Sequence, residues 1–243
     1  MRKDAAPILE MRQVSMVYRN DVVETHALRR FDLTVREGEF VAITGPSGSG
    51  KTTFLSIAGL LETASSGEYR LDGQRVEALS DRQRSELRNQ KIGFVFQSFN
   101  LIPELDLRNN VELPLRYRGM PAGERRRRAE HALGTVGLGL RVDHFPAQLS
   151  GGQQQRAAIA RALVGEPRLL LADEPTGNLD SGMAQGILEL LERLNDQGCT
   201  IAMVTHDPVV AARAGRRLRL LDGTVVHESP ATSHGHEAAI AAG

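Results

Sequence analysis

The most restrictive feature of the sequence is a glycine-rich loop at residues 45–52, Gly-Pro-Ser-Gly-Ser-Gly-Lys-Thr. It follows an apolar stretch typical of a buried strand and precedes a stretch with the apolar spacing of a helix. In such a loop the glycines let successive backbone N–H groups point inward at phosphate oxygens, beside the positive end of the helix. An ordinary glycine-rich turn would not need these two flanks. The loop therefore predicts an α/β domain that binds a nucleotide.

The positions of this loop have distinct expected contacts. Lys51 is expected to neutralise the β- and γ-phosphates, and the Thr52 hydroxyl to ligate Mg²⁺. The residues predicted to bind the nucleotide here are Gly45, Pro46, Ser47, Gly48, Ser49, Gly50, Lys51, Thr52 and Thr53. The helix that follows is expected to carry Phe54, Leu55, Ile57 and Leu60.

A second apolar stretch, residues 169–172, ends in two acids, Asp173 and Glu174. A strand of this kind would bring Asp173 next to the phosphate loop, where it can hold Mg²⁺ through water. Glu174 would follow at the carboxyl end of the strand, where α/β sheets bind ligands, and could accept a proton from an attacking water. The alternative interpretation is an ordinary strand that ends in two solvated acids. The presence of the phosphate loop in the same chain favours the functional interpretation.

A further candidate phosphate site is Leu-Ser-Gly-Gly-Gln at residues 149–153, directly before a predicted helix. Ser150 is a plausible N-cap, and the helix N-terminus behind it attracts anions. Two such sites far apart in one sequence suggest that two chains meet head to tail, each offering its second site to the nucleotide of the other.

With these motifs in view, the chain resembles the ATP-binding cassette (ABC) proteins from Tyr18 to about Val226. The resemblance implies ATP and Mg²⁺ as ligands, ATP hydrolysis, and a homodimer of cassettes. It further implies roles within one chain: Tyr18 stacks on adenine, Gln97 contacts Mg²⁺ and water, and His206 contacts the γ-phosphate. Across the dimer, it implies that Asp180 crosses the interface and that the nucleotide of the other chain is met by Ser150, Gly151, Gly152 and Gln153. With Glu174 and Lys51, Gln97 and His206 form the expected catalytic set; Thr52, Gln97 and Asp173 form the expected metal site.

Residues 92–101, 110–115 and 173–180 are similar to the lipoprotein-releasing, macrolide-exporting and cell-division (LolD/MacB/FtsE-like) subfamily. The resemblance implies a membrane permease partner with a large extracytoplasmic domain, reached from the cytoplasmic face of the inner membrane. Two outputs stay open: export or lipoprotein release, and a mechanical signal to periplasmic enzymes without transport. The groove beside Gln97 and the helical segment after it is the expected contact with the permease.

The order of predicted elements indicates a parallel sheet covered on both faces, and the resemblance implies an α/β P-loop NTPase fold with a mixed-sheet core and an inserted helical subdomain. The core is assigned to residues 1–97 and 149–228, the subdomain to 98–148, and a mobile tail to 229–243. Strands are expected at residues 8–18, 31–44 with a turn at Glu37-Gly38, 68–71, 92–96, 169–173 and 200–205. Helices are expected after residue 50, at 81–89, 152–164 and 183–194, and from Pro208, before a hairpin around Asp222-Gly223.

Composition argues against some function classes. Lys+Arg and Asp+Glu both number 30, so there is no general attraction to nucleic acid, and a soluble nucleic-acid or ribosome-associated cassette is disfavoured. Cys199 is the one cysteine, which rules out an intrachain disulfide. No apolar run reaches the roughly 18 residues of a membrane helix. Two smaller features stay open: the arginines at 125–128, read as a solvated helix face or a lipid contact, and the histidines near the C-terminus, His227, His234 and His236, read as a solvated tail or a metal site.

Overall fold

The computed structural model describes residues 5–19 and 24–229 of the 243-residue chain. The strands are β1 (Pro7–Arg19), β2 (Glu24–Arg36), β3 (Phe40–Thr44), β4 (Ser66–Leu71), β5 (Gln74–Arg75), β6 (Ile92–Val95), β7 (Leu169–Asp173), β8 (Ile201–Val204), β9 (Arg216–Leu221) and β10 (Thr224–Ser229). The helices are α1 (Lys51–Ala58), α2 (Asp81–Lys91), α3 (Leu107–Tyr117), α4 (Ala122–Thr135), α5 (Gly151–Leu163), α6 (Ser181–Asp196) and α7 (Pro208–Ala211), with short 3-10 helices η1 (Gly139–Arg141) and η2 (Pro146–Gln148).

The strands form two sheets. A six-stranded sheet has the order β10-β9-β3-β8-β7-β6, and all its pairs are parallel except the β9–β10 hairpin. A four-stranded antiparallel sheet has the order β2-β1-β4-β5. The predicted α/β fold with a mixed sheet is therefore confirmed.

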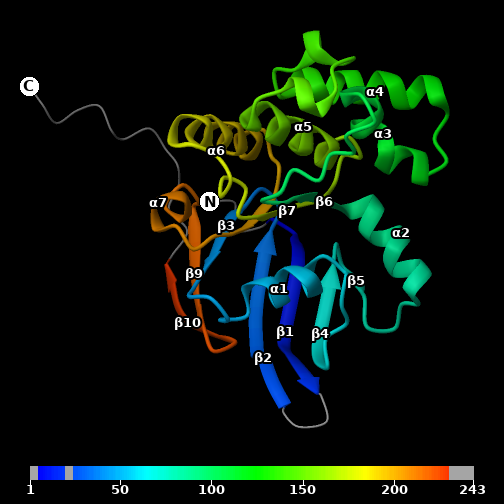
Figure 1. The fold of residues 1–243 in the computed structure, drawn as a ribbon. Coiled ribbons are helices and arrows are strands. Elements are labelled where there is room, and N and C mark those ends of the chain that lie inside the picture. Colours follow the sequence, from blue (N-terminus) through cyan, green and yellow to red (C-terminus); the bar gives the residue numbers. More distant parts are fainter. Residues whose placement is uncertain (1–4, 20–23, 230–243) are drawn as a thin grey trace, which may run out of the picture.

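Successive residues of the central strands point into two different hydrophobic cores. On β7, Leu170 and Ala172 pack with helices α3 to α6, while Leu169 and Leu171 pack with α1 and the antiparallel sheet. Because both sets are fully buried, the parallel strands read as continuous apolar runs. Both faces of the sheet are covered, as expected, but one of them is covered by α1 and a second sheet (Figure 1).

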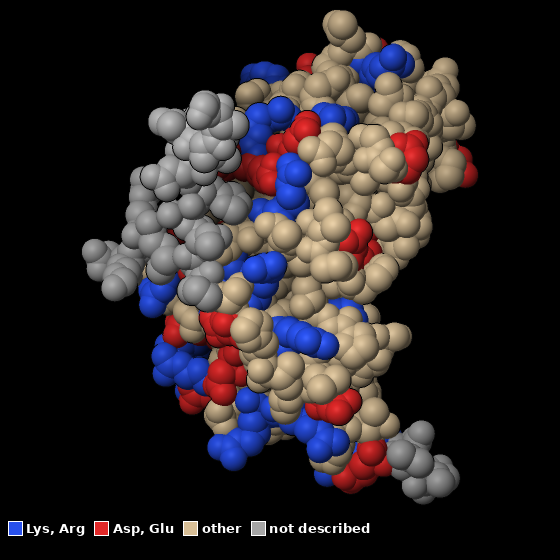
Figure 2. Space-filling model, turned by 90° about the vertical axis from the view of Figure 1, so that its left-hand side faces the viewer, with Lys and Arg blue, Asp and Glu red and all other residues tan. Residues whose placement is uncertain are grey.

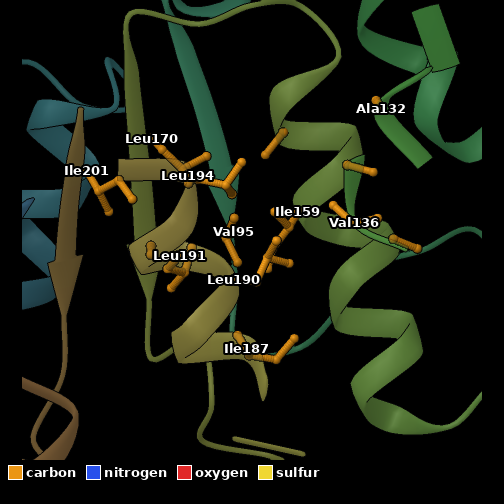
Figure 3. Packing of buried hydrophobic residues seen from close by; sticks show 14 of the residues in the cluster. Val95, Ala132, Val136, Ile159, Leu170, Ile187, Leu190, Leu191, Leu194 and Ile201 are labelled. Carbon is orange, nitrogen blue, oxygen red and sulfur yellow. The ribbon is translucent and has the colours of Figure 1, made fainter. Parts of the chain in front are cut away.

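The packing on the helical face centres on α6. Its buried side chains, which include Ile187, Leu190, Leu191 and Leu194, lie against Val95 of β6 and Ile159 of α5 (Figure 3). The 3- and 4-residue spacing of these side chains gives α6 one apolar stripe, and the sheet and α5 cover it. This packing holds α5 in place above the sheet.

Residues 98–148 contain α3, α4, η1 and η2 and no strand. Asp106 caps α3, accepting a hydrogen bond from the Asn109 backbone N–H at 2.7 Å. Buried side chains of α3 and α4 join the same core as α5. The assignment of 98–148 as a subdomain, separate from a core of 1–97 and 149–228, stays a prediction.

Some element boundaries differ from the predicted ones. Strand β2 begins at Glu24 rather than Phe31, because the stretch before Phe31 continues the antiparallel pairing with β1 and buries Leu28. Helix α1 ends at Ala58, so Leu60 lies beyond it, although its side chain is still buried. His227 lies in β10, opposite Arg219, whereas His234 and His236 and the predicted tail after Ser229 lie outside the described residues.

The arginines at 125–128 lie on α4, and most of their charge is balanced within the chain. Arg127 and Arg128 pair with Glu124, and Arg125 pairs with Glu112. These ion pairs favour the interpretation as a solvated helix face over a lipid contact. On the face that Figure 2 shows, Lys and Arg are likewise interspersed with Asp and Glu.

No helix in the described ranges is both long and apolar enough to cross a membrane.

The position of α6 makes a stability prediction. Leu191→Ala removes a fully buried side chain from the core between α6 and the sheet. We expect the free energy of unfolding to fall by about 2–5 kcal/mol, as for other buried Leu→Ala changes. Leu140→Ala is the matched control, because Leu140 is 100% exposed on η1, and its effect should stay within about 0.5 kcal/mol. Urea unfolding of both variants measures the difference; equal losses would contradict the packing described here.

Candidate active site

The predicted site residues lie where neighbouring parallel strands end. The glycine-rich loop follows β3, Gln97 follows β6, Asp173 and Glu174 close β7, and His206 follows β8. The strand register places Ile43 and Asp173 each opposite Val204. Because the carboxyl ends of parallel strands meet at one edge, the sheet gathers these loops in the crevice where α/β proteins bind ligands.

The loop at residues 45–50 can form only with glycine at its ends. Gly50 has a φ of 103°, and a Cβ there would lie 2.4 Å from the Ala27 carbonyl oxygen of β2. A Cβ on Gly45 would lie equally close to the Leu220 carbonyl oxygen of β9. The loop is therefore wedged between two strands, which fixes the path of its backbone.

The loop leaves backbone donors for an anion. Within the described part of the chain no side chain caps α1, and its first turn holds no acid, so the N–H groups of Lys51, Thr52 and Thr53 keep the unsatisfied geometry of a helix N-terminus. The Lys51 ammonium donates hydrogen bonds to the carbonyls of Gly45 at 2.8 Å and Pro46 at 2.7 Å. It thus lies across the mouth of the loop, where it can meet a phosphate.

Asp173 is half-buried at the end of β7, and its electrostatic neighbours are the loop lysine and the next acid. Burial raises the pKa of the Asp173 carboxyl, and the charge of Glu174 raises it further, whereas Lys51 acts in the opposite direction. An additional cation beside Asp173 would stabilise its ionised form.

Glu174 is held at both carboxylate oxygens. Its Oε2 accepts a hydrogen bond from the Thr205 hydroxyl at 3.0 Å, and its Oε1 accepts one from the His206 backbone N–H at 2.9 Å. The Nδ1 atom of the His206 ring lies 2.7 Å from the same Oε1. The Glu174 side chain is 16% exposed and that of His206 74%, so the acid is largely buried beside an exposed histidine. Glu174 also has a φ of 44°, strained for a non-glycine residue, as often found at functional sites.

Ser150 caps α5, as predicted. Its hydroxyl accepts a hydrogen bond from the Gln153 N–H at 3.4 Å, and the Gln153 side chain accepts one from the Ser150 N–H at 3.0 Å. Helices α5 and α1 lie on opposite faces of the six-stranded sheet. Among the described residues, no hydrogen bond or ion pair joins 150–153 to the loop at 45–53. A single chain therefore keeps its two predicted phosphate sites apart.

Tyr18 and Asp180 occupy different surroundings. The Tyr18 hydroxyl donates a 2.6 Å hydrogen bond to Glu62, and burial and this carboxylate raise its pKa, while the Thr53 hydroxyl lowers it. Tyr18 thus lies beside the start of α1 with its ring partly exposed. Asp180 is exposed at the N-cap of α6, where it accepts a hydrogen bond from the Met183 N–H at 2.9 Å.

Comparison with known proteins identifies the fold and its family. The family model described as ABC transporter matches residues 28–177. The chain belongs to the ABC transporter family. It is 48% identical over 218 residues to an uncharacterized ABC transporter ATP-binding protein of Thermotoga maritima, covering 90% of this chain and 93% of that protein. It superposes with a TM-score of 0.83 and 44% identity on a dimeric, post-hydrolysis structure of the ATP-binding cassette MJ0796 bound to ADP and Pi, covering 92% of this chain and 99% of that one.

Longer relatives match as well. The macrolide export ATP-binding/permease protein MacB 1/2 of Paracoccus denitrificans is 48% identical over 226 residues. The match covers 93% of this chain and 34% of that protein. The cassette thus spans about a third of the length of the MacB relatives that it matches.

The cassette offers a donor set that fits Mg²⁺. Thr52 supplies a hydroxyl, Asp173 a carboxylate and Gln97 a side-chain amide oxygen, all hard oxygen donors. In the described ranges, no group of three or more His, Cys, Asp or Glu could hold a metal by itself. This pattern suits Mg²⁺, which proteins bind through one or two carboxylates together with substrate phosphates and water.

Sequence reasoning missed two residues that organise the cassette site. Thr205 is buried, and its hydroxyl bridges two residues. It donates a hydrogen bond to Glu174 and accepts one from the Asp207 backbone N–H at 3.1 Å. Gln155 is buried in α5 and donates hydrogen bonds to the carbonyls of Phe96 at 3.1 Å and Pro175 at 2.6 Å. Thr205 ends the strand predicted at residues 200–205, directly before His206, and Gln155 lies two residues after the motif at 149–153, so proximity to predicted site residues was the available signal.

The Thr205 bridge predicts a stability difference between two conservative variants. Thr205→Val keeps the side-chain shape but leaves the Asp207 N–H and Glu174 Oε2 without this partner, which should cost about 1–3 kcal/mol of unfolding free energy. Thr205→Ser keeps the hydroxyl and should recover most of that loss. Chemical denaturation of both proteins is the measurement. A valine variant as stable as the parent protein would contradict the assignment of this stability to the hydrogen bonds.

Proposed function

We propose that the chain is the ATP-binding and ATP-hydrolysing subunit of a MacB/LolD-type membrane transport complex, and that two copies close head to tail around two ATP molecules. The observation that carries this proposal is the separation of the phosphate loop and the Ser150 helix on opposite faces of the sheet. A second copy related by two-fold symmetry supplies the missing half of each site. The similar cassette MJ0796 is dimeric and bound to ADP and Pi, which supports a dimer of this chain as well.

The binding step uses both copies. The loop at residues 45–53 of one copy surrounds the phosphates, and Lys51 leaves its carbonyl partners for the β- and γ-phosphates. The tyrosine ring at position 18 stacks on adenine. Residues 150–153 of the second copy approach the γ-phosphate, and its Asp180 crosses the interface. Closure excludes water, which strengthens each of these polar contacts.

The chemical step assigns Glu174 as the group that receives a proton. A water oxygen attacks the γ-phosphorus, the bond from that phosphorus to the bridging oxygen of ADP breaks, and the water proton passes to the Glu174 carboxylate. The hydrogen bonds from the Thr205 hydroxyl and the His206 backbone N–H hold this carboxylate in place. Thr52, Asp173 and Gln97 would hold Mg²⁺, which would neutralise phosphate charge when bound.

The partner is an integral permease with a large extracytoplasmic domain, and the chain acts at the cytoplasmic face of the inner membrane. The names of the MacB relatives, which combine ATP-binding and permease, support a membrane partner. Export or lipoprotein release is the proposed output. Nucleic acid is not a proposed partner, in keeping with the even charge balance.

The proposed docking surface for the permease is a groove of about 830 Å³ that α2, β6, α3 and α5 line. Its apolar part includes the stacked rings of Phe94 and Phe96, 5.4 Å apart, and the exposed ring of Tyr117. Its polar part is rich in arginine. Arg88 and Arg118 donate hydrogen bonds to the backbone carbonyls of Leu60 and Gly165, and these carbonyls carry no net charge that would neutralise the arginines. A permease segment with apolar and acidic side chains would complement this lining.

Glu174→Gln is the sharpest test of the chemistry. The variant keeps the shape of the side chain but cannot accept the proton, so ATP should still bind while hydrolysis falls by at least about 100-fold. ATP should then hold the two copies closed. Phosphate release and light scattering with and without ATP measure both effects.

Lys51→Ala serves as the contrasting variant, because it should lose ATP affinity and with it ATP-dependent dimerisation. Unchanged turnover in Glu174→Gln would contradict the role of this acid. Normal nucleotide binding by Lys51→Ala would contradict the role assigned to the loop.

The membrane role is tested with the same trapped protein. Full-length Glu174→Gln, purified from detergent-solubilised membranes with ATP, should bring down a permease with a large extracytoplasmic domain, identified by mass spectrometry. Arg118→Glu and Tyr117→Ala in the groove should weaken this recovery while ATP binding persists. Recovery of only soluble proteins, ribosomes or nucleic acid would overturn the membrane role and leave the ATPase chemistry in place.

A further inference from the structure

The side chain of Asn178 makes a two-point contact with Gln97, 81 residues earlier in the chain. The Gln97 Nε2 atom donates a hydrogen bond to Asn178 Oδ1 at 3.0 Å. The Asn178 Nδ2 atom donates one to the backbone carbonyl of Gln97 at 3.2 Å. The loop after β7 thus holds the residue that follows β6 by both its main chain and its side chain.

These two contacts determine which way both amides face. A backbone carbonyl can only accept, so the nitrogen of the Asn178 amide must be the atom that faces the Gln97 main chain. Its oxygen is then the atom left for the Gln97 side chain, and an oxygen can be met only by the Gln97 nitrogen. These two hydrogen bonds together determine the orientation of the Gln97 side-chain amide, and its oxygen is directed to the side away from Asn178.

The backbone beside Asn178 makes room for this arrangement. Gly177 lies directly under the Gln97 side chain, and a Cβ at position 177 would lie 2.8 Å from Gln97 Nε2 and 3.0 Å from its Cδ. A larger residue at position 177 would therefore displace the Gln97 amide without removing either hydrogen-bonding partner.

We infer that Asn178 is a positioning residue, which turns the oxygen of the Gln97 amide rather than its nitrogen toward the metal-nucleotide site. The inference rests on the proposed function, in which Gln97 contacts Mg²⁺. A divalent cation requires an oxygen ligand, and a reversed amide would present N–H donors to it. Outer partners that orient a ligand commonly change metal affinity although they never touch the metal.

The location of Asn178 adds a consequence for the dimer. It lies two residues before Asp180, in the segment proposed to cross to the second copy. A shift of this segment on closure would move the partner that orients Gln97. The metal ligand of one site would thereby respond to the approach of the other copy.

The test measures metal binding without turnover. In full-length Glu174→Gln protein with ATP present, Mn²⁺ is titrated and free Mn²⁺ is read by its electron paramagnetic resonance signal. Asn178→Leu should raise the dissociation constant for Mn²⁺ about tenfold, the lower end of the effect of such outer partners. ATP affinity measured with the metal chelated should stay at the parent value. Gly177→Ala should raise the same constant.

A double-variant cycle separates orientation from a general loss of structure. With Gln97→Leu already present, adding Asn178→Leu should cause no further loss, since the group it orients is gone. Asn195→Leu is the matched control: the Asn195 side chain likewise makes two hydrogen bonds, donating to the backbone carbonyls of Gly38 and Cys199, but at the C-terminal end of α6. It should leave the dissociation constant for Mn²⁺ unchanged.

The outcomes are distinct. Tight Mn²⁺ binding by both Asn178→Leu and Gly177→Ala overturns the inference and leaves the proposed function intact. Additive losses in the double variant also overturn it, because Asn178 would then act independently of Gln97. A parent protein that binds no Mn²⁺ with ATP overturns the proposed function itself. If Asn178→Leu fails to fold, Asn178→Ser and Gly177→Ala decide the same question.

Discussion

The parallel pairing of β3, β8 and β7 is the constraint on which the rest of the structure depends. Each of these strands is buried on both faces, so its register fixes two cores at once, and a slip by one residue would exchange them. The same register sets where each strand ends, and the loops after those ends carry the lysine, the two acids and the histidine. Stability and chemistry thus rest on one set of backbone hydrogen bonds.

The two faces of the sheet have separate tasks. One face supports the phosphate loop through α1 and the antiparallel sheet, and the other supports the Ser150 cap through α5 and α6. Because the sheet lies between them, no small movement within one chain can join these halves. The proposed assembly of two copies therefore follows from the layer order, and the buried Gln155 keeps the α5 half attached to the loops after β6 and β7.

The sequence predicted those parts of the site that depend on local spacing. The glycine-rich loop, the acids after β7 and the Ser150 cap each follow from residues within one short stretch. The second sheet was harder to predict. Strand β2 begins with polar residues from Glu24, and this stretch is a strand because it pairs with β1. The contacts of Thr205 with Glu174 and of Asn178 with Gln97 span 31 and 81 residues, and no local pattern encodes such pairs. Residue roles that come from the family resemblance stay predictions until variants test them.

The groove and the proposed metal site share one short segment of chain. Phe94 and Phe96 line the groove, and Gln97 is the next residue along the same backbone. A molecule docked in the groove and a nucleotide at the strand ends are thus two ligands of one segment. Thermodynamic reciprocity then applies: if docking shifts this segment so that nucleotide binds more tightly, nucleotide must tighten docking by the same factor. A permease would sense the nucleotide through its own affinity for the groove.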